Sequence, residues 1–174
     1  MGLFVPDFYY DTIYDVTPEL LLKRGVKGII LDIDNTLVPY EIPEPTEEVR
    51  AWLNLMSENG MKIAFVSNNH APRVELFNKT LSFPAFPDSG KPLKKSCLKA
   101  LDAMECKPEE VALIGDQVFT DVLAGKIAKM NTTVLVKPIK DKKNLFFRFK
   151  RLLEKPVIRT YNRREKKREK DGNG

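Results

Sequence analysis

The sequence has little cysteine and histidine and no long hydrophobic run. Its two cysteines, Cys97 and Cys106, have no histidine or further cysteine nearby, so they fit no zinc-ligand pattern, and we expect two reduced thiols in a cytosolic protein. No apolar run approaches the roughly 18 residues that span a membrane. The first residues lack a basic segment followed by a long apolar one, so we expect no secretory signal. Disulfide-rich, zinc-binding and transmembrane classes are thereby disfavoured.

The charges are distributed unevenly. The chain has 174 residues, 43% hydrophobic and 30% charged, with a net charge of +5, which suits one globular domain. Residues 1–141 carry 16 Lys and Arg against 20 Asp and Glu, whereas residues 142–170 carry 13 against 3. We therefore expect a mildly acidic domain over residues 1–141, followed by a strongly basic tail.

The most informative segment begins at Ile29 and ends at Leu37. Its apolar part is typical of a buried parallel strand, which we place at 28–33. Asp32 and Asp34 end this strand, at the sheet edge where ligands of open α/β folds bind. Two neighbouring carboxylates repel each other unless a cation lies between them, and hard oxygen ligands suit Mg²⁺. A turn or a helix cap is the alternative interpretation of this pair.

Strand and helix patterns alternate along the rest of the chain, which predicts an α/β fold with a central parallel sheet and right-handed crossovers. Residues 3–16 show no clear period and are predicted to be an irregular arm. The remaining elements are expected as further strands at 61–66, 111–114 and 132–136, a short extended piece at 82–87, and helices at 18–24, 47–59, 72–81, 93–104 and 120–128.

Four polar loops follow these strands or lead into the next helix: Asp32-x-Asp34-x-Thr36, Ser67-Asn68, Lys91-Pro92 and Gly115-Asp116-x-x-x-x-Asp121. In this order and over residues 28–136, they resemble the four motifs of the haloacid-dehalogenase-like (HAD) superfamily of phosphatases. The resemblance implies the three-layer α/β/α Rossmann-like fold of that family and a phosphoric monoester hydrolase.

The resemblance also implies roles for these residues. Asp32 corresponds to the nucleophile that forms an aspartyl-phosphate, and Asp34 to the residue that protonates the leaving oxygen and then activates water. Lys91 corresponds to the lysine that offsets the gathered negative charge. The implied Mg²⁺ ligands are Asp32, Asp34 (through its backbone carbonyl), Asp116 and Asp121, and the implied substrate-binding residues are Ser67, Asn68, Thr36 and Lys91.

Several of these residues also have a purely structural interpretation. Asp121 could lie near a helix start, where the helix dipole favours an acid. Thr36 fits a role in orienting its loop. Lys94 and Lys95 rival Lys91 but look like solvated helix lysines. The single histidine, His70, follows the second motif and could face the substrate, but a surface position is the favoured interpretation. Trp52 and Phe77 are predicted in the core.

HAD enzymes often insert a cap domain after the first or the second motif. Here 30 residues separate Thr36 from Ser67, and 22 separate Asn68 from Lys91. We therefore expect no cap domain and an open crevice, with the proline-rich segment 39–45 at its rim. Such a site suits a phosphate that protrudes from a large substrate.

The basic tail begins with a predicted amphipathic helix at 142–155, whose apolar stripe is formed by Leu145, Phe146, Phe149, Leu152 and Leu153. The stripe either packs on the sheet or, with the surrounding basic residues, contacts an anionic membrane surface. Residues 156–174 are predicted to be disordered. This tail could bind phospholipid, RNA or nothing specific.

Within the superfamily, segment 31–38 and segment 66–69 are similar to the YqeG family of subfamily IIIA, related to mitochondrial phosphatidylglycerophosphate phosphatases. This similarity implies phosphatidylglycerol phosphate as the substrate and a cytoplasmic protein, peripheral at the inner face of the membrane. The alternatives are a soluble phosphometabolite or nucleotide phosphatase, and a nucleic-acid- or protein-binding module that uses the basic tail.

Overall fold

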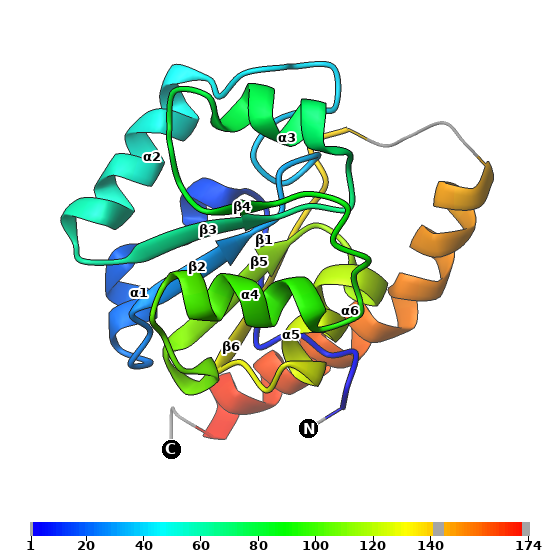
Figure 1. The fold of residues 1–174 in the computed structure, drawn as a ribbon. Helices are drawn as coiled ribbons and strands as arrows, with labels where there is room; N and C mark the ends of the chain where they lie inside the picture. Colours follow the sequence, from blue (N-terminus) through cyan, green and yellow to red (C-terminus); the bar gives the residue numbers. More distant parts are fainter. Residues whose placement is uncertain (1, 141–144, 172–174) are drawn as a thin grey trace.

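Six parallel strands form one central sheet with helices on both faces (Figure 1). The structure is a computed structural model that describes residues 2–140 and 145–171. The strand order β1-β6-β5-β2-β3-β4 places β2 and β5 side by side in the middle of the sheet. The strands are β1 (Phe8–Tyr10), β2 (Gly28–Leu31), β3 (Lys62–Val66), β4 (Ala85–Phe86), β5 (Val111–Gly115) and β6 (Thr132–Val136).

The helices make the two outer layers. Helices α1 (Pro18–Leu22), α2 (Glu47–Glu58) and α3 (Ala71–Asn78) pack on one face, and α4 (Lys95–Ala103) and α5 (Leu123–Ile127) on the other (Figure 1). A π-helical turn, Val118–Val122, precedes α5, and α6 (Leu145–Asp171) follows the sheet. The predicted three-layer α/β/α architecture is confirmed.

Side chains alternate between the two faces of the sheet along each strand, so the strands contribute to a hydrophobic core on each face. In β2, Ile29 and Leu31 join the cluster under α1, α2 and α3, whereas Ile30 joins the cluster under α4 and α5. Because helices cover both faces, all four residues of β2 are buried. This explains why the segment reads as a continuous apolar run in the sequence.

Helix α2 forms where the sequence predicts it. The Thr46 side chain caps its first turn by accepting a hydrogen bond from the Val49 amide at 3.3 Å. Trp52 is buried on its inner face, and the indole nitrogen donates to the Val16 carbonyl oxygen at 3.0 Å. The predictions that Trp52 and Phe77 belong to the core are confirmed.

The N-terminal arm differs from the sequence expectation. Residues 8–10 form the edge strand β1, which pairs in parallel with β6. Asp7 fixes its start: its Oδ2 accepts hydrogen bonds from the Thr133 amide at 2.8 Å, the Thr133 hydroxyl at 2.9 Å and Lys126 Nζ at 2.7 Å. A three-residue strand is too short to show a hydrophobic period, so the pattern missed it.

Helix α6 is longer than predicted. It continues to Asp171, so the prediction of a disordered segment beyond residue 155 is wrong for residues 156–171. Val157 and Ile158 pack against Val118, Val122 and Leu135, which gives this part of the helix an apolar contact with the domain.

Two members of the predicted apolar stripe of α6 do not lie on its packed face. Glu154 is buried and accepts a hydrogen bond from the Val118 amide at 3.0 Å, whereas Leu152 and Leu153 are 56% and 46% exposed. The side chains of the earlier stripe members lie outside the described residues, as do residues 172–174 of the predicted tail. Among the residues that the structure describes, no helix combines the length and the apolar character needed to cross a membrane.

The two segments that hold caps in other HAD enzymes are short, as predicted. A loop and α2 fill the first, and α3 and β4 fill the second. Within residues 2–140, which are all described, neither segment forms a separate domain.

The hydrogen bonds of Asp7 with Lys126 and Thr133 lead to a prediction about stability. Burial alone would raise the pKa of Asp7, but the bonds from Lys126 and Thr133 lower it below its ordinary value of 3.8. We expect Asp7→Asn to lower the free energy of unfolding by about 1–3 kcal/mol at pH 7. Because the pKa is lowered, this difference should persist above pH 3.8 and disappear as the pH falls below it.

Denaturant unfolding of both proteins between pH 3 and pH 8 measures this difference. Asp11→Asn is the matched control, because Asp11 pairs with Lys137 at the surface, and it should change stability by at most about 0.5 kcal/mol. An equal loss in both variants, or a loss from Asp7→Asn that does not depend on pH, would contradict this account.

Candidate active site

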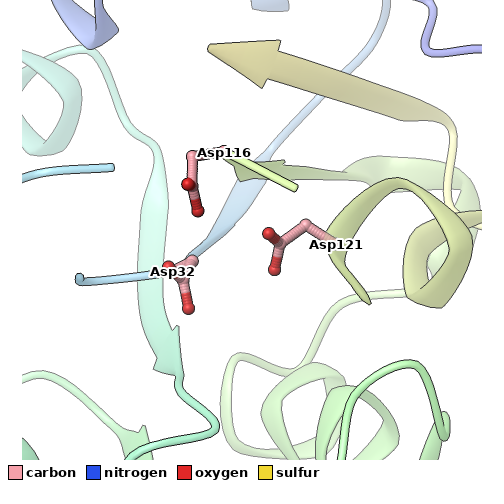
Figure 2. A group of neighbouring side chains, drawn as sticks. All are labelled: Asp32, Asp116 and Asp121. Atoms are coloured by element: carbon pink, nitrogen blue, oxygen red, sulfur yellow. The ribbon is translucent and has the colours of Figure 1, made fainter. Parts of the chain in front are cut away.

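Three carboxylates converge at the carboxyl ends of the two central strands (Figure 2). Asp32 directly follows β2, and its amide donates to the Ile114 carbonyl oxygen of β5 at 3.0 Å. Asp116 directly follows β5, and Asp121 lies in the π-helical turn. One oxygen from each side chain lies within 4.8 Å of the others, and all three residues are buried. The structure thus brings together three of the predicted metal ligands.

Lys91 lies beside this acidic cluster, which we define as Asp32, Asp116 and Asp121. Its Nζ is 2.7 Å from Asp32 Oδ1 and 2.6 Å from Asp121 Oδ1, and it also donates to the Val66 carbonyl oxygen at 2.7 Å. Lys91 is buried, whereas Lys94 and Lys95 are exposed. The lysine at the site is therefore Lys91, as the motif predicted.

One buried ammonium faces more than one buried carboxylate, and the pKa shifts reflect this imbalance. Burial raises the pKa of Asp32, the Lys91 ammonium lowers it and Asp121 raises it again, so that it lies at about 6 instead of 3.8. Burial lowers the pKa of Lys91, but Asp121 and Asp32 outweigh burial and raise it above its ordinary value. Lys91 is thus held as the cation, and the cluster retains excess negative charge. A divalent cation would balance that charge.

Two hydrogen bonds and close packing on the Gly115 backbone hold the Asp121 side chain in place. Its Oδ2 accepts hydrogen bonds from the Gln117 amide at 3.1 Å and the Thr120 hydroxyl at 3.3 Å. The side chain packs directly over Gly115, where an added Cβ would overlap the Asp121 carboxyl carbon. Glycine at position 115 therefore leaves the space in which this carboxylate lies.

Asp34 does not point its carboxylate into the cluster. Its Oδ1 accepts two hydrogen bonds from Arg73, at 3.2 Å from Nε and 2.9 Å from Nη2, and its Oδ2 accepts one from Asn69 Nδ2 at 2.9 Å. Reasoning from the sequence missed both partners. A lone arginine in the helix after the second motif was the only available signal for Arg73.

Of the other predicted residues, Thr36 bonds Asp32 and Asn68 bonds the Lys91 backbone. The Thr36 hydroxyl donates to Asp32 Oδ2 at 3.3 Å, which agrees with its predicted role in orienting the loop. Ser67 directly follows β3, is buried, and accepts a hydrogen bond from the Asn69 amide at 3.1 Å. The Asn68 side chain bonds the segment before Lys91, accepting from the Ser89 hydroxyl at 2.6 Å and the Lys91 amide at 2.7 Å. Asn68 Nδ2 also donates to the Lys91 carbonyl oxygen at 3.1 Å, so both ends of the side-chain amide contact the Lys91 loop.

His70 lies at the surface, as predicted. Its Nδ1 is 2.6 Å from Asp88 Oδ1, and both side chains are largely exposed. The hydrogen bond described for the ring goes to Asp88 and not to an acid of the cluster.

Comparisons with known proteins agree with this geometry. A protein-family model of haloacid dehalogenase-like hydrolases matches residues 40–129. The probable phosphatase YqeG of Bacillus subtilis is 39% identical over 161 residues, which is 92% of this chain and 93% of that protein. The chain therefore belongs to the haloacid dehalogenase-like hydrolase family and, within it, to the YqeG group that its motifs resemble.

Solved structures show the same fold. The cobalt-bound deoxy-D-mannose-octulosonate 8-phosphate phosphatase of Haemophilus influenzae matches with a TM-score of 0.54 and 13% identity, over 80% of this chain and 91% of that one. An uncharacterized protein from Listeria monocytogenes matches with a TM-score of 0.53 and 14% identity, over 68% and 85%. At these identities the matches support the HAD fold alone.

The raised pKa of Asp32 leads to a prediction about the stability of the metal-free protein. Between pH 3.8 and about 6 the folded state keeps the proton that the unfolded state loses, so ionisation of Asp32 lowers stability as the pH rises. In a chelator at pH 7.5, we expect Asp32→Asn to raise the free energy of unfolding by about 1–3 kcal/mol.

Urea unfolding in the presence of a chelator measures this change. Asp102→Asn, which removes an exposed acid of α4, should leave stability unchanged within about 0.5 kcal/mol. A destabilised Asp32→Asn protein would mean that the Asp32 carboxylate is fully compensated without a metal.

Proposed function

We propose that this protein is a Mg²⁺-dependent phosphomonoesterase that acts through an aspartyl-phosphate on Asp32. The observation that carries this proposal is the position of Asp32 at the carboxyl end of β2, within the acidic cluster and 2.7 Å from Lys91. A phosphate dianion repels a carboxylate nucleophile, so catalysis of its transfer depends on positive charge placed around both groups. The family and the relative named a probable phosphatase support this activity.

The reaction has two balanced steps. In the first, an Asp32 oxygen forms a bond to phosphorus, the bond from phosphorus to the leaving oxygen breaks, and the Asp34 carboxyl gives its proton to that oxygen. In the second, Asp34 takes a proton from water, the water oxygen bonds to phosphorus, and the bond to Asp32 breaks. Inorganic phosphate leaves, and Asp32 is regenerated. We propose that Lys91 neutralises charge in both steps, with Ser67 bonding a phosphoryl oxygen.

The residues of the acidic cluster fit a magnesium ion. They supply hard oxygen donors, are buried, and together exceed the positive charge of Lys91. Asp32 and Asp116 would hold the ion with the backbone carbonyl of Asp34. Asp121, which also pairs with Lys91 at 2.6 Å, would add negative charge beside the ion. When bound, the ion supplies electrostatic stabilisation of the charge on the transferring phosphoryl group.

The first functional test uses a generic aryl phosphate. Purified protein with Mg²⁺ should release phosphate from 4-nitrophenyl phosphate, and a chelator should abolish the release. Asp32→Asn should lower kcat by at least about 10³-fold, because a carboxamide cannot form the acyl phosphate. Asp102→Asn should retain full activity. Unchanged turnover in Asp32→Asn would overturn the nucleophile assignment.

The best substrate is proposed to be phosphatidylglycerol phosphate, a lipid head-group phosphate. The short segments around α2 and α3 leave the site without a separate cap domain within residues 2–140, so a phosphate at the surface of a lipid aggregate has access. The outward side of α6 carries Arg159, Arg163 and Lys167, which are exposed and one turn apart. Such a basic stripe attracts an anionic surface, at roughly 1 kcal/mol per residue.

Two other functions use the same features. A soluble phosphometabolite or nucleotide phosphatase needs only the Asp32 site. A module that binds nucleic acid or an acidic protein needs only the basic tail. We favour the lipid phosphatase because it uses both the open site and the basic helix.

The substrate test compares phosphatidylglycerol phosphate in mixed micelles with a panel of soluble phosphates. We expect the lipid to give the highest kcat/KM. The triple variant Arg159→Glu, Arg163→Glu, Lys167→Glu should lose about 10-fold or more on anionic micelles, since three charges are reversed, but little on 4-nitrophenyl phosphate. High salt should reduce the difference.

The matched control reverses three exposed lysines elsewhere on the domain, Lys62, Lys79 and Lys99, and should leave micelle activity nearly unchanged. Efficient turnover of one soluble metabolite with no turnover of the lipid would overturn the substrate proposal. Equal losses in the two triple variants would overturn the specific role of α6.

A further inference from the structure

We propose that Arg73 is a positioning residue that aims the Asp34 carboxyl at the leaving oxygen and joins it to the proline-rich segment 39–45. This inference rests on the proposed phosphatase function. The guanidinium makes two hydrogen bonds to Asp34 Oδ1, at 3.2 Å and 2.9 Å. Both side chains are largely buried, at 14% and 15% exposure, so the pair is shielded from competing water.

The start of α3 and a neighbouring ring fix the arginine. Arg73 is the third residue of α3, which begins at Ala71 with Pro72 in its first turn. Its guanidinium carbon lies 5.8 Å from the centre of the Phe77 ring, one turn further along the same helix. Because Phe77 is fully buried, the ring supports the guanidinium from a rigid position.

The guanidinium also holds the proline-rich segment 39–45. Nη2 donates to the Ile42 carbonyl oxygen and Nη1 to the Pro43 carbonyl oxygen, each at 2.8 Å. Both acceptors lie in the proline-rich segment 39–45 that follows the first motif. One planar cation therefore orients the catalytic acid and the adjacent loop together. A lysine ammonium lacks the fixed fork that reaches all three acceptors.

The pattern of bonds identifies the oxygen that handles the proton. Arg73 bonds only Oδ1, and Oδ2 accepts a single bond, from Asn69 at 2.9 Å. The Asn69 side chain is itself oriented, since its Oδ1 accepts from the His70 amide at 2.8 Å. When Asp34 acts as the acid, Oδ1 remains the acceptor for Arg73, and Oδ2 carries the proton to the leaving oxygen while one of its lone pairs still accepts from Asn69. Arg73 thus selects Oδ2 as the atom that gives the proton and later takes it from water.

This role predicts a loss that depends on the leaving group. An alkoxide needs a proton as it departs, whereas 4-nitrophenolate does not. We expect Arg73→Met to lower kcat on glycerol phosphate by about 10²-fold, the lower end for a general acid, and on 4-nitrophenyl phosphate by less than about 5-fold, with KM little changed on both. Arg73→Lys, which keeps the charge, should restore only part of the glycerol phosphate activity.

A double-mutant cycle tests the connection to Asp34. If Arg73 acts through this carboxyl, Arg73→Met combined with Asp34→Asn should be no slower on glycerol phosphate than Asp34→Asn alone. Arg50→Met is the matched control: Arg50 lies on α2, bonds Thr80 at 2.6 Å and makes no described contact with Asp34. It should leave both substrates unaffected.

Three outcomes would contradict the proposal. Equal losses on both substrates with a raised KM would make Arg73 a ligand of the phosphoryl group. Additive losses in the cycle would make it independent of Asp34. Full rescue by lysine would mean that only the positive charge of the residue matters, and not the geometry of the guanidinium. Each of these outcomes leaves wild-type activity intact, whereas a wild-type protein that releases no phosphate from either substrate would overturn the proposed function, and the role of Arg73 with it.

Discussion

The excess negative charge buried at the end of the sheet is the constraint on which the rest of the site depends. Three buried carboxylates lie close together, and one buried ammonium, that of Lys91, pairs with two of them, Asp32 and Asp121. Such an arrangement is costly unless a further cation joins it. The neighbouring positions of β2 and β5 bring Asp32 and Asp116 together. Gly115 leaves space for Asp121, and the Asn68 side chain holds the loop that delivers Lys91.

The two acids of the first motif have different hydrogen-bond partners, although only one residue lies between them in the sequence. Asp32 turns toward Lys91 and the acidic cluster, whereas Asp34 turns toward Arg73 and Asn69. A carboxylate that attacks phosphorus and a carboxyl that exchanges a proton need different environments. The structure supplies them from different elements: the loop after β4 provides Lys91, and the start of α3 provides Arg73.

The sequence predicted the central strands, α2 and the motif-bearing loops because their signals are local: buried apolar runs, a threonine cap and polar residues at strand ends. It missed β1, whose position depends on Asp7 reaching Thr133 across 126 residues of chain. It also ended α6 too early, because the inward contacts of Val157 and Ile158 are tertiary. Arg73 was missed for the same reason, since its three acceptors lie in the connection between β2 and α2, 30 to 39 residues away along the chain. The roles of the individual site residues remain predictions.

The central claim is that a divalent cation balances the charge of the acidic cluster. Anomalous scattering from a crystal of this protein grown with Mn²⁺ in place of Mg²⁺ tests it most directly. The account predicts one strong peak in direct contact with carboxylate oxygens of both Asp32 and Asp116, with Lys91 still bonded to Asp121. A map that shows no metal between Asp32 and Asp116, in a protein that is active under the same conditions, would contradict it.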